Sequence, residues 1–409
     1  MIAVDAARLR ADFEQLASIG RAPDGATRRT TFSDAHFEAR AWFAARAAAA
    51  GLELRVDEAG NQSAVLPGGD GASRTLLLGS HLDSVPAGGA YDGALGVVAA
   101  LEALRAIKDA GVTLPVTLEA IDFTDEEGAL VGLLGSWALA GALTPEILGS
   151  PRGGRERLLA ALQRAGLTEE GLYEARRDPD TLAGYLELHI EQGPVLDSER
   201  IGIGVVTAIA GSRSYLLVFR GARRHAGTTP IDARRDALLG AARFALSVRE
   251  TAARDFPGCV GTVGGIEVER AAFNVVPGCA QVLLELRAPD GDQLDSFESE
   301  VLGAARHEAA AAALELQVEH VGRWDPVVLD KSMRSAIASA ARGLNLRTRE
   351  LISGAGHDAQ ALAAVTPAGM IFVPSVGGIS HDPAEHTRWD DCVSGANVLL
   401  TTAVAVARG

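Results

Sequence analysis

Imidazole and carboxylate side chains occur in four separated parts of the sequence. They are His81 with Asp92, Glu126 with Glu127, His189, and His381. Nitrogen and oxygen ligands of this kind suit zinc, manganese, nickel or cobalt, and the absence of thiolates from the set disfavours a purely structural zinc site. Any one of these histidines alone is more often a hydrogen-bonded structural residue, whereas the whole set predicts a metal centre.

The segment "GSHLDSVPAGGAYDG", Gly79–Gly93, holds the first two of these side chains. Because side chains of an extended segment alternate, His81 and Asp83 share a face, and the carboxylate of Asp83 is placed to orient the imidazole. Gly93 permits a tight turn after Asp92, so that this carboxylate can project into a shared cavity as a bridging ligand. The alternative for this segment alone is a polar turn that ends in a helix cap.

Three consecutive acids close an apolar run in "FTDEEG", Phe123–Gly128. This concentration of like charge is costly unless cations neutralise it or one acid stays protonated. Because adjacent extended residues point to opposite sides, Glu126 and Glu127 can hold different roles, one beside a metal and the other as a general base for an attacking water. A solvated acidic loop is the alternative.

The residues with this chemistry are positioned by segments that alternate between strand and helix patterns. His189 ends the apolar run of "LHIEQG" with Gln192 beside it, although a hydrogen-bonded sheet histidine would leave the same pattern. The alternation predicts an α/β fold with a central mixed sheet flanked by helices, and its polar motifs fall at strand ends, where open sheets place their sites. The expected strands lie within 75–84, 114–128, 183–196, 200–211 and 369–378, and a helix lies within 95–111.

The pattern changes in the middle of the chain. Strands and helices there are expected in the order β-α-β-β-α-β, which is typical of a ferredoxin-like α+β insertion. We therefore predict a discontinuous catalytic domain of residues 1–210 and 324–409 and an inserted domain of residues 211–323, with a hinge at each boundary.

Length and composition exclude several classes of function. A chain of 409 residues favours two domains, and its formal net charge of −15 argues against a nucleic-acid groove or an anionic membrane surface. Cys259, Cys279 and Cys392 are odd in number and lack C-x-x-C spacing, so neither a disulfide framework nor a thiolate zinc site is expected. The first residues lack a signal-peptide pattern, and no apolar run approaches the roughly 18 residues of a membrane span, which together predict a cytoplasmic protein.

Seven motifs in a fixed order resemble the amidase/hydantoinase/carbamoylase branch of the dinuclear metallopeptidase family, which includes carboxypeptidase G and aminoacylase. Each motif alone is weak, but seven in order from about Gly79 to Glu385 are highly specific. The resemblance implies a homodimer in which each chain has a catalytic α/β domain and a smaller lid and dimerisation domain. The motifs are "GSHLDSVPAGGAYDG", "DFTDEEG", "ELHIEQGPVL", "RRHAGTTPIDARRDA", "FNVVPG", "SGAGHDAQ" and "FVPSVGGISHDPAE".

The resemblance also implies two divalent metal ions per subunit, of zinc, manganese, cobalt or nickel. Glu126 resembles the general base, and His386 is a rival to His381 as a ligand, although the "GGISHxxxE" pattern selects His381. Position 189 carries a histidine where the peptidase branches usually have an aspartate, which favours substrates other than peptides. The implied ligands are His81, Asp92 and His189 for one metal and Asp92, Glu127 and His381 for the other.

Several substrate contacts are implied in the same way. His225 resembles an oxyanion donor that reaches across the dimer. Asn274 and Arg287 resemble clamps for a substrate carboxylate, and Gln192 and His357 resemble further contacts. Without the resemblance, Arg287 is simply a charged residue on a strand and Asn274 a turn residue. The chain departs from the family near these contacts at Ser212, Ser214, Arg223, Arg224 and Ile231, which leaves the substrate side chain open.

Members of this branch hydrolyse N-carbamoyl-L-amino acids, N-carbamoyl-β-alanine, allantoate or ureidoglycolate. We therefore predict metal-dependent hydrolysis of the ureido C–N bond of an N-carbamoyl-L-amino acid. The nearest alternatives are allantoate or ureidoglycolate amidohydrolase, followed by N-carbamoyl-β-alanine hydrolase or aminoacylase. A metal-free homologue that only binds ligands is disfavoured by the complete ligand set. The predicted partners are a small ureido substrate with a carboxylate and a second copy of the chain, with no nucleic acid and no membrane.

Overall fold

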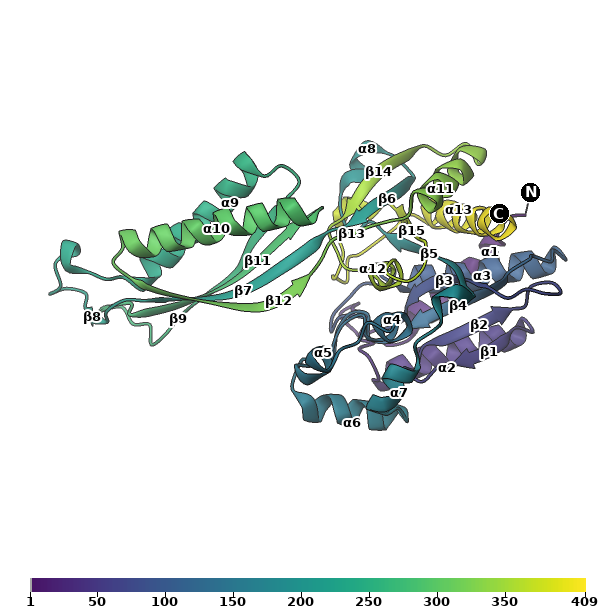
Figure 1. The fold of residues 1–409 in the computed structure, drawn as a ribbon, viewed down its shortest axis with the longest axis horizontal. Coiled ribbons are helices and arrows are strands. Elements are labelled where there is room, and N and C mark those ends of the chain that lie inside the picture. Colours follow the sequence, from purple (N-terminus) through teal and green to yellow (C-terminus); the bar gives the residue numbers. More distant parts are fainter. Residues whose placement is uncertain (1) are drawn as a thin grey trace. The chain divides into compact units, whose positions relative to one another are not determined.

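The chain folds into two compact units, as the computed structural model in Figure 1 shows for residues 2–409. The first, which we call the discontinuous unit, comprises Met1–Thr207 and Val328–Gly409. The second, the inserted unit, comprises Ala208–Val327. The role of the inserted unit as a lid and dimerisation domain stays a prediction.

The discontinuous unit is organised around one large sheet that contains both parallel and antiparallel pairs. β3 pairs in parallel with β4 and with β5, and β5 pairs in parallel with β15, whereas β2 and β4 are antiparallel. The prediction of a mixed sheet flanked by helices is therefore confirmed. In spatial order the strands are β1 (Glu53–Val56), β2 (Gln62–Leu66), β4 (Thr117–Phe123), β3 (Thr75–His81), β5 (Leu182–Ile190), β15 (Ala368–Val373), β6 (Ile203–Ile209) and β13 (Val327–Val328), with β14 (Thr348–Ser353) beside β6.

Alternation along β5 separates the core of this unit from its polar residues. Leu188 belongs to the apolar core that includes residues of α3 (Ala94–Asp109) and α13 (Trp389–Arg408). Glu187 and His189 point to the opposite side of the sheet, because neighbouring strand residues face opposite ways. Both are nevertheless fully buried, so each of these polar groups needs a partner.

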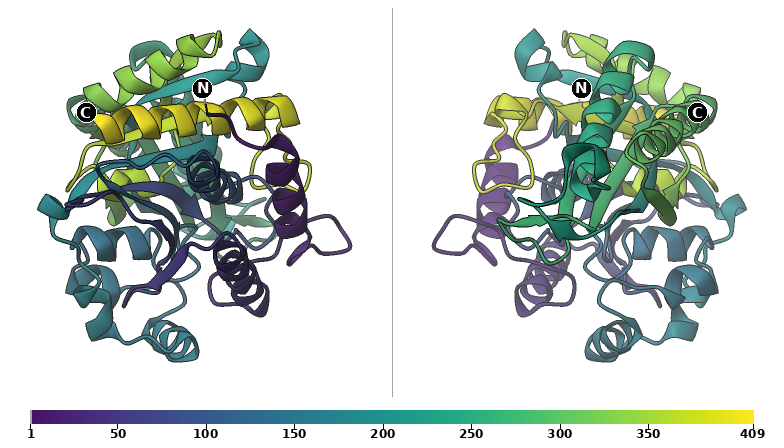
Figure 2. Two further views of the ribbon diagram at one scale, coloured as in Figure 1. Left: turned by 90° about the vertical axis from the view of Figure 1, so that its right-hand side faces the viewer. Right: turned by 90° about the vertical axis from the view of Figure 1, so that its left-hand side faces the viewer.

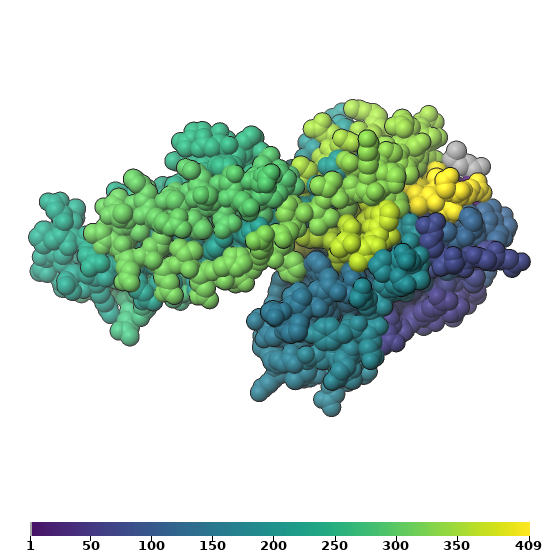
Figure 3. Space-filling view, viewed as in Figure 1, coloured from purple at the N-terminus to yellow at the C-terminus, as the bar shows by residue number. Residues whose placement is uncertain are grey.

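Helices from both ends of the chain pack together in this unit. α13 lies beside α1, α3 and α11, and Figure 2 shows the purple α1 at one end of the yellow α13. In Figure 3 the same yellow segment lies beside blue and purple segments from the early part of the chain. The other helices are α1 (Ala6–Ser18), α2 (Asp34–Ala49), α4 (Leu134–Ala140), α5 (Pro145–Gly149), α6 (Arg155–Ala165), α7 (Glu169–Glu174), α8 (Val195–Glu199), α11 (Lys331–Gly343) and α12 (Asp358–Leu362).

The inserted unit is a four-stranded antiparallel sheet with two long helices packed on it. The strands lie in the order β12-β7-β11-β9, and the chain order is strand, helix, strand, strand, helix, strand. Two short strands, β8 (Arg224–His225) and β10 (Val275–Val276), form a separate pair. The main elements are β7 (Gly211–Arg220), α9 (Ala237–Asp255), β9 (Val260–Val268), β11 (Cys279–Ala288), α10 (Gly291–Ala311) and β12 (Glu315–Trp324).

Several elements are shorter than their sequence patterns. β4 ends at Phe123, so the three acids that follow it lie on a loop rather than on a strand. In the inserted unit, α9 begins at Ala237, where the side chain of Asp236 caps it by accepting the N–H groups of Leu238 and Leu239. Among residues 2–409, no helix is both long enough and apolar enough to cross a membrane.

Candidate metal centre

The candidate site lies where three parallel strands of the discontinuous unit end. β3 is the central strand of the three, between β4 and β5, and it ends at His81. His189 is the penultimate residue of β5. Because the carboxyl ends of parallel neighbours meet at one edge of a sheet, the loop that follows β4 comes to the same place. The sheet topology therefore brings together segments that are far apart in the sequence.

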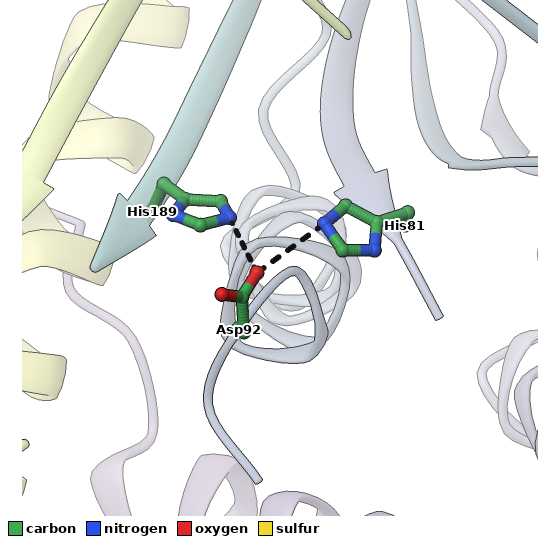
Figure 4. A group of neighbouring side chains, drawn as sticks. All are labelled: His81, Asp92 and His189. Atoms are coloured by element: carbon green, nitrogen blue, oxygen red, sulfur yellow. Dashed lines mark ion pairs between the residues drawn. The ribbon is translucent and has the colours of Figure 1, made fainter. Parts of the chain in front are cut away.

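Two histidines from neighbouring strands face one carboxylate in the first group of candidate ligands (Figure 4). The Nε2 atom of His189 lies 3.1 Å from Oδ1 of Asp92, and the Nε2 atom of His81 lies 3.5 Å from the same oxygen. All three side chains are buried. The Nε2 atom of His81 has no hydrogen-bond partner among the described residues, which leaves a buried nitrogen lone pair directed at the group.

Asp92 also belongs to the second group, through its other oxygen. The Nε2 atom of His381 lies 3.4 Å from Oδ2 of Asp92 and 3.6 Å from Oε2 of Glu127. The two oxygens of Asp92 thus face different groups, which is the arrangement of a bridging carboxylate. His381 is the exposed member, with 49% of its side chain accessible, and its backbone has a φ of 56°. A non-glycine residue in this left-handed region is uncommon and frequently marks a functional site.

The main chain orients the two buried imidazoles. The Nδ1 atom of His81 lies 3.1 Å from the carbonyl oxygen of Asp83, and the Nδ1 atom of His189 lies 2.9 Å from that of Ile190. An N–H at Nδ1 that donates to a carbonyl leaves the Nε2 lone pair free for a cation. We predicted that the carboxylate of Asp83 would orient His81, but its Oδ1 atom is farther away, at 3.7 Å. The carbonyl of the same residue is the closer partner.

Gly93 is required beside this group for two reasons. Its φ is 63°, in the region that L side chains rarely adopt, and a Cβ atom there would lie 2.4 Å from the imidazole of His81. Any side chain at this position would therefore displace His81. The turn after Asp92 depends on glycine, as the "YDG" pattern indicated.

In the acidic loop after β4, the side chain of Asp125 binds the main chain of the loop, whereas Glu126 and Glu127 face the site. Asp125 has a φ of 57°, and its carboxylate accepts hydrogen bonds from the main-chain N–H groups of residues 130–132. Burial, together with the nearby carboxylate of Asp83, raises the pKa of Asp125 to about 6. The prediction of different roles for Glu126 and Glu127 rested on strand alternation, and that reason was wrong because these residues lie on a loop.

Glu126 and Glu127 nevertheless take different places. Glu127 belongs to the group with His381, whereas Glu126 belongs to neither group of candidate ligands. The Oε2 atom of Glu126 lies 3.4 Å from Nε2 of His81. A carboxylate that is beside the candidate ligands but not among them is placed to exchange a proton with a group at the centre.

Burial and crowding shift the proton affinities of these groups. Burial, with the Glu127 carboxylate adding to it, raises the pKa of Glu126 well above its usual range. Burial and Asp92 raise the pKa of Glu127 to about 7. The hydrogen bond to Asp92 raises the pKa of His381 to about 9. The carboxyl groups of Glu126 and Glu127 therefore lose their protons at a higher pH than free ones.

Asp92 shows the opposite shift. Burial acts to raise the pKa of Asp92, but the surrounding histidines, His189 above all, hold it well below its usual range. Asp92 is therefore an anion among these imidazoles.

The residues present fit a divalent cation. Their donor atoms are imidazole nitrogens and carboxylate oxygens, the set that zinc, manganese, cobalt and nickel accept, and each group places its atoms within 4.8 Å of one another. The unpartnered Nε2 atom of His81 and the anionic Asp92 both favour a positive ion between them. The residues that would hold it are the two groups described above.

Gln192 and His357, predicted as substrate contacts, also border the centre. The Nε2 atom of Gln192 donates to Oδ2 of Asp92 at 2.7 Å, and the residue has a φ of 58°. The ring of His357 meets that of His189 edge to face at 4.6 Å, and its Nε2 atom lies 2.8 Å from the hydroxyl of Ser353. Burial lowers the pKa of His357 well below its usual value, so its imidazole is neutral.

Glu187 is a site residue that we did not predict. It forms a further group with His189 and His357, and all three side chains are buried. Its Oε1 atom accepts from the hydroxyl of Ser80, and its Oε2 atom accepts from the main-chain N–H of Ala359. Alternation in "LELHI" was the signal available, because it places Glu187 on the same face as His189.

The other predicted substrate contacts lie in the inserted unit. His225 is exposed on the short strand β8, opposite Val275. Asn274 is exposed, and its carbonyl accepts the N–H of Ala226. Arg287 lies on β11, where its Nη2 atom is 3.0 Å from a carboxylate oxygen of Glu285. The substrate roles of His225, Asn274 and Arg287 stay predictions.

His386, the rival to His381, is directed elsewhere. Its Nδ1 atom lies 3.2 Å from the phenol oxygen of Tyr91, and it is absent from each group of candidate ligands found among residues 2–409. The geometry therefore favours His381 over His386.

Comparison with known proteins extends over nearly the whole chain. Residues 77–405 match the family described as Peptidase family M20/M25/M40. The chain is 36% identical over 397 residues to an N-carbamoyl-L-amino acid amidohydrolase of Geobacillus stearothermophilus, covering 97% of each. It is 35% identical over 416 residues to a ureidoglycolate hydrolase of Oryza sativa subsp. japonica, covering 99% of this chain and 85% of that one.

Another relative and a solved structure are also similar to the chain over nearly its whole length. The chain is 32% identical over 380 residues to an allantoate amidohydrolase of Bacillus subtilis (strain 168), covering 91% of each. A crystal structure of an amidase of the hydantoinase/carbamoylase family from Burkholderia multivorans has a TM-score of 0.91 and 35% identity, covering 100% of this chain and 99% of that one. The chain therefore belongs to the peptidase M20/M25/M40 family and is a hydrolase that acts on amide or ureido bonds.

Proposed function

We propose that the enzyme hydrolyses the ureido C–N bond of an N-carbamoyl-L-amino acid. The observation that carries this proposal is the place of Glu126, which lies 3.4 Å from His81 of the first group of candidate ligands and belongs to neither group. A carboxylate in that place suits general-base hydrolysis of a carbonyl compound. The relative at 36% identity over 97% of the chain, which is named N-carbamoyl-L-amino acid amidohydrolase, supports this substrate class.

The proposal includes two divalent cations per subunit. His81, Asp92 and His189 would hold one, and Asp92, Glu127 and His381 the other, as in the two groups described above. When bound, such ions lower the pKa of water toward neutrality and polarise the carbonyl group that is attacked.

The residues of the chain carry the proton and orient the substrate. The Glu126 carboxylate takes a proton from the attacking water as the C–O bond forms at the ureido carbon. His225 of a partner subunit in the proposed homodimer donates a hydrogen bond to the oxyanion. Glu126 then returns the proton to the nitrogen of the breaking C–N bond, and ammonia departs. The carbamate that remains loses carbon dioxide and leaves the amino acid.

Recognition of the substrate carboxylate is assigned to the inserted unit. The planar guanidinium of Arg287 can donate two parallel hydrogen bonds to a carboxylate, and the amide of Asn274 can donate a third. Gln192 and His357 border the candidate metal centre and would contact the ureido end. Closure of the inserted unit as a lid would exclude water during the reaction.

Ammonia release is the experiment that tests the proposal. The purified protein, first stripped with a chelator and then supplied with zinc, manganese, cobalt or nickel, is assayed with N-carbamoyl-L-amino acids that differ in side chain. We expect ammonia and the free amino acid in equal amounts with added metal, and neither without it. The proposal fails if none of the metal-loaded forms releases ammonia from any N-carbamoyl-L-amino acid.

The same assay decides between this proposal and its nearest alternatives. Ureidoglycolate and allantoate also carry a ureido group and a carboxylate, and relatives at 35% and 32% identity bear the corresponding names. A kcat/KM at least tenfold higher for ureidoglycolate or allantoate than for every N-carbamoyl-L-amino acid would assign the enzyme to that substrate. N-carbamoyl-β-alanine and an N-acetyl amino acid complete the panel.

A further inference from the structure

Glu385 connects the two loops that meet at the second group of candidate ligands. It follows His381 by four residues and is 6% exposed. Its Oε1 atom accepts hydrogen bonds from the main-chain N–H groups of Tyr91 at 2.8 Å and of Asp92 at 3.1 Å. The loop that ends in Asp92 is therefore bound to a side chain nearly three hundred positions later in the chain.

The second oxygen of Glu385 is connected to the side-chain carboxylate of Asp92 through Ser380. The hydroxyl of Ser380 lies 2.9 Å from Oε2 of Glu385 and 2.9 Å from Oδ2 of Asp92. One hydroxyl proton serves these two acceptors, so Ser380 can donate to Glu385 when a cation occupies the oxygen of Asp92. Glu385 thus contacts both the main chain and, through Ser380, the carboxylate of Asp92.

The fit around Glu385 is close. A Cβ atom at Gly89 would lie 2.1 Å from Oε1 of Glu385, so the glycine provides the room for the carboxylate. The main-chain N–H of Glu385 also donates to the carbonyl of Asp382, which fixes the turn after His381. Residues of both loops therefore fix the position of the Glu385 side chain.

The two groups differ in what holds them in place. His81 and His189 lie on β3 and β5, which are neighbours in the sheet, so main-chain pairing sets the distance between them. Glu127 and His381 lie on loops, and the sheet does not set the distance of either residue from Asp92. The second group therefore needs a separate connection between its loops.

We propose that Glu385 is a positioning residue that, together with Ser380, holds Asp92 and His381 at the separation that a second cation requires. This rests on the two-cation site of the proposed function. Removal of the Glu385 carboxylate lets the loops separate, so it weakens the group with Glu127 and His381 more than the group with His81 and His189. Mutation of a residue that orients metal ligands in this way typically lowers the metal affinity by roughly 10- to 100-fold.

Zinc binding without substrate tests the proposal. The metal-free wild type and the variants Glu385→Ala, Glu385→Gln and Ser380→Ala are titrated with zinc against a chromophoric chelator, and bound zinc is counted by metal analysis. We expect Glu385→Ala to bind its first zinc within threefold of wild type and its second roughly 10- to 100-fold more weakly. Glu385→Gln keeps an oxygen for the N–H groups of Tyr91 and Asp92, so it should largely restore the second site.

The controls separate a positioning role from a loss of structure. Asp382→Asn removes a charge from the same exposed turn and should bind zinc like wild type. Thermal unfolding of the metal-free proteins shows whether each variant folds. If Glu385→Ala does not fold, Ser380→Ala decides, because it removes only the hydroxyl between Glu385 and Asp92, leaves the bonds of Glu385 to the main chain, and should weaken the second zinc alone.

The outcomes of the zinc titration can be distinguished from those of the assay that tests the proposed function. Wild-type affinity for both zinc ions in folded Glu385→Ala, or equal loss of both, would overturn the role of Glu385 even if the enzyme hydrolyses N-carbamoyl amino acids. A wild-type protein that binds only one zinc would instead overturn the two-cation site itself. A selective loss of the second zinc supports the positioning role whichever ureido compound is the substrate.

Discussion

The carboxylate of Asp83 accepts a hydrogen bond from the main-chain N–H of Glu127 at 3.2 Å. It also accepts one from the N–H of Glu126 at 3.3 Å, and the hydroxyl of Thr31 donates to it at 2.9 Å. Asp83 lies two residues after His81, so it joins the end of β3 to the acidic loop that follows β4. Its side chain thus positions the acidic loop, and its carbonyl positions His81.

The variant Asp83→Asn tests the role of the side chain, because it leaves the main-chain carbonyl in place. An asparagine side chain cannot accept from the same set of donors without turning its own NH₂ group toward one of them, so the loop with Glu126 shifts. We expect kcat to fall roughly 10- to 100-fold, the usual effect of losing a residue that orients a metal site. Steady-state kinetics and metal analysis check this, with Asp70→Asn, at an exposed position, as the control. Unchanged kcat in Asp83→Asn would contradict the role.

The variants Glu126→Gln and Glu127→Gln should lose different properties, the first its catalytic rate and the second its bound metal. Glutamine at 126 cannot take a proton, so kcat should fall by roughly 10²- to 10⁴-fold while bound metal stays at the wild-type level. Glutamine at 127 removes a carboxylate from the group with His381, so bound metal itself should decrease. Metal analysis and kinetics on the same preparations distinguish the two. Full activity of metal-loaded Glu126→Gln would rule out its role as the base.

Arg287→Ala should affect the substrate and not the metal. A lost charge-assisted hydrogen bond costs about 2 kcal/mol, so kcat/KM should fall on the order of 30-fold, mainly through KM. Bound metal should not change, because Arg287 belongs to none of the candidate ligand groups. The control is Arg270→Ala, a more exposed arginine of the same unit. A wild-type KM for Arg287→Ala would count against the carboxylate clamp.

Asp122 should make the metal-free protein less stable as the pH rises. Burial raises the pKa of Asp122 to about 6, although Arg40 lies 3.3 Å from its carboxylate. Because this folded pKa lies above the unfolded value of about 4, the protonated form stabilises the fold below pH 4, and that stabilisation is lost as the pH rises through 6. The loss amounts to at most about 3 kcal/mol.

Asp122→Asn removes this titration. Urea unfolding at pH 4.5 and 7.5 measures the free energy of unfolding of both proteins without metal. We expect the wild type to lose stability relative to Asp122→Asn as the pH rises, although the variant also weakens the hydrogen bond that Asp122 accepts from the N–H of Leu82. A difference between the two proteins that is the same at both pH values would show that Asp122 titrates normally.

Much of the candidate site could be predicted from local patterns. "HLDS" places a histidine at a strand end, and "YDG" places a carboxylate before a turn that requires glycine, as the φ of 63° at Gly93 confirms. Apolar runs that end in polar residues indicated the central sheet, because buried parallel strands are apolar along their length. These features depend on neighbouring residues, so one stretch of sequence contains them.

Other features depended on residues that are distant in sequence. Strand alternation assigned Glu126 and Glu127 to opposite faces, but both lie on a loop whose path is set by the Asp83 carboxylate and by the turn at Asp125. Glu187 and Glu385 were not predicted, because their partners, such as Ala359 and Tyr91, lie far along the chain.

The sequence by itself determined which side chains are available and which of them end strands. The family resemblance implied that Asp92 bridges two groups, and the tertiary structure decided the distances, with one oxygen of Asp92 toward His81 and His189 and the other toward His381. The physical reason is that side-chain spacing along a strand follows from its two-residue period, whereas the distance between separate segments depends on strand pairing and on hydrogen bonds between loops.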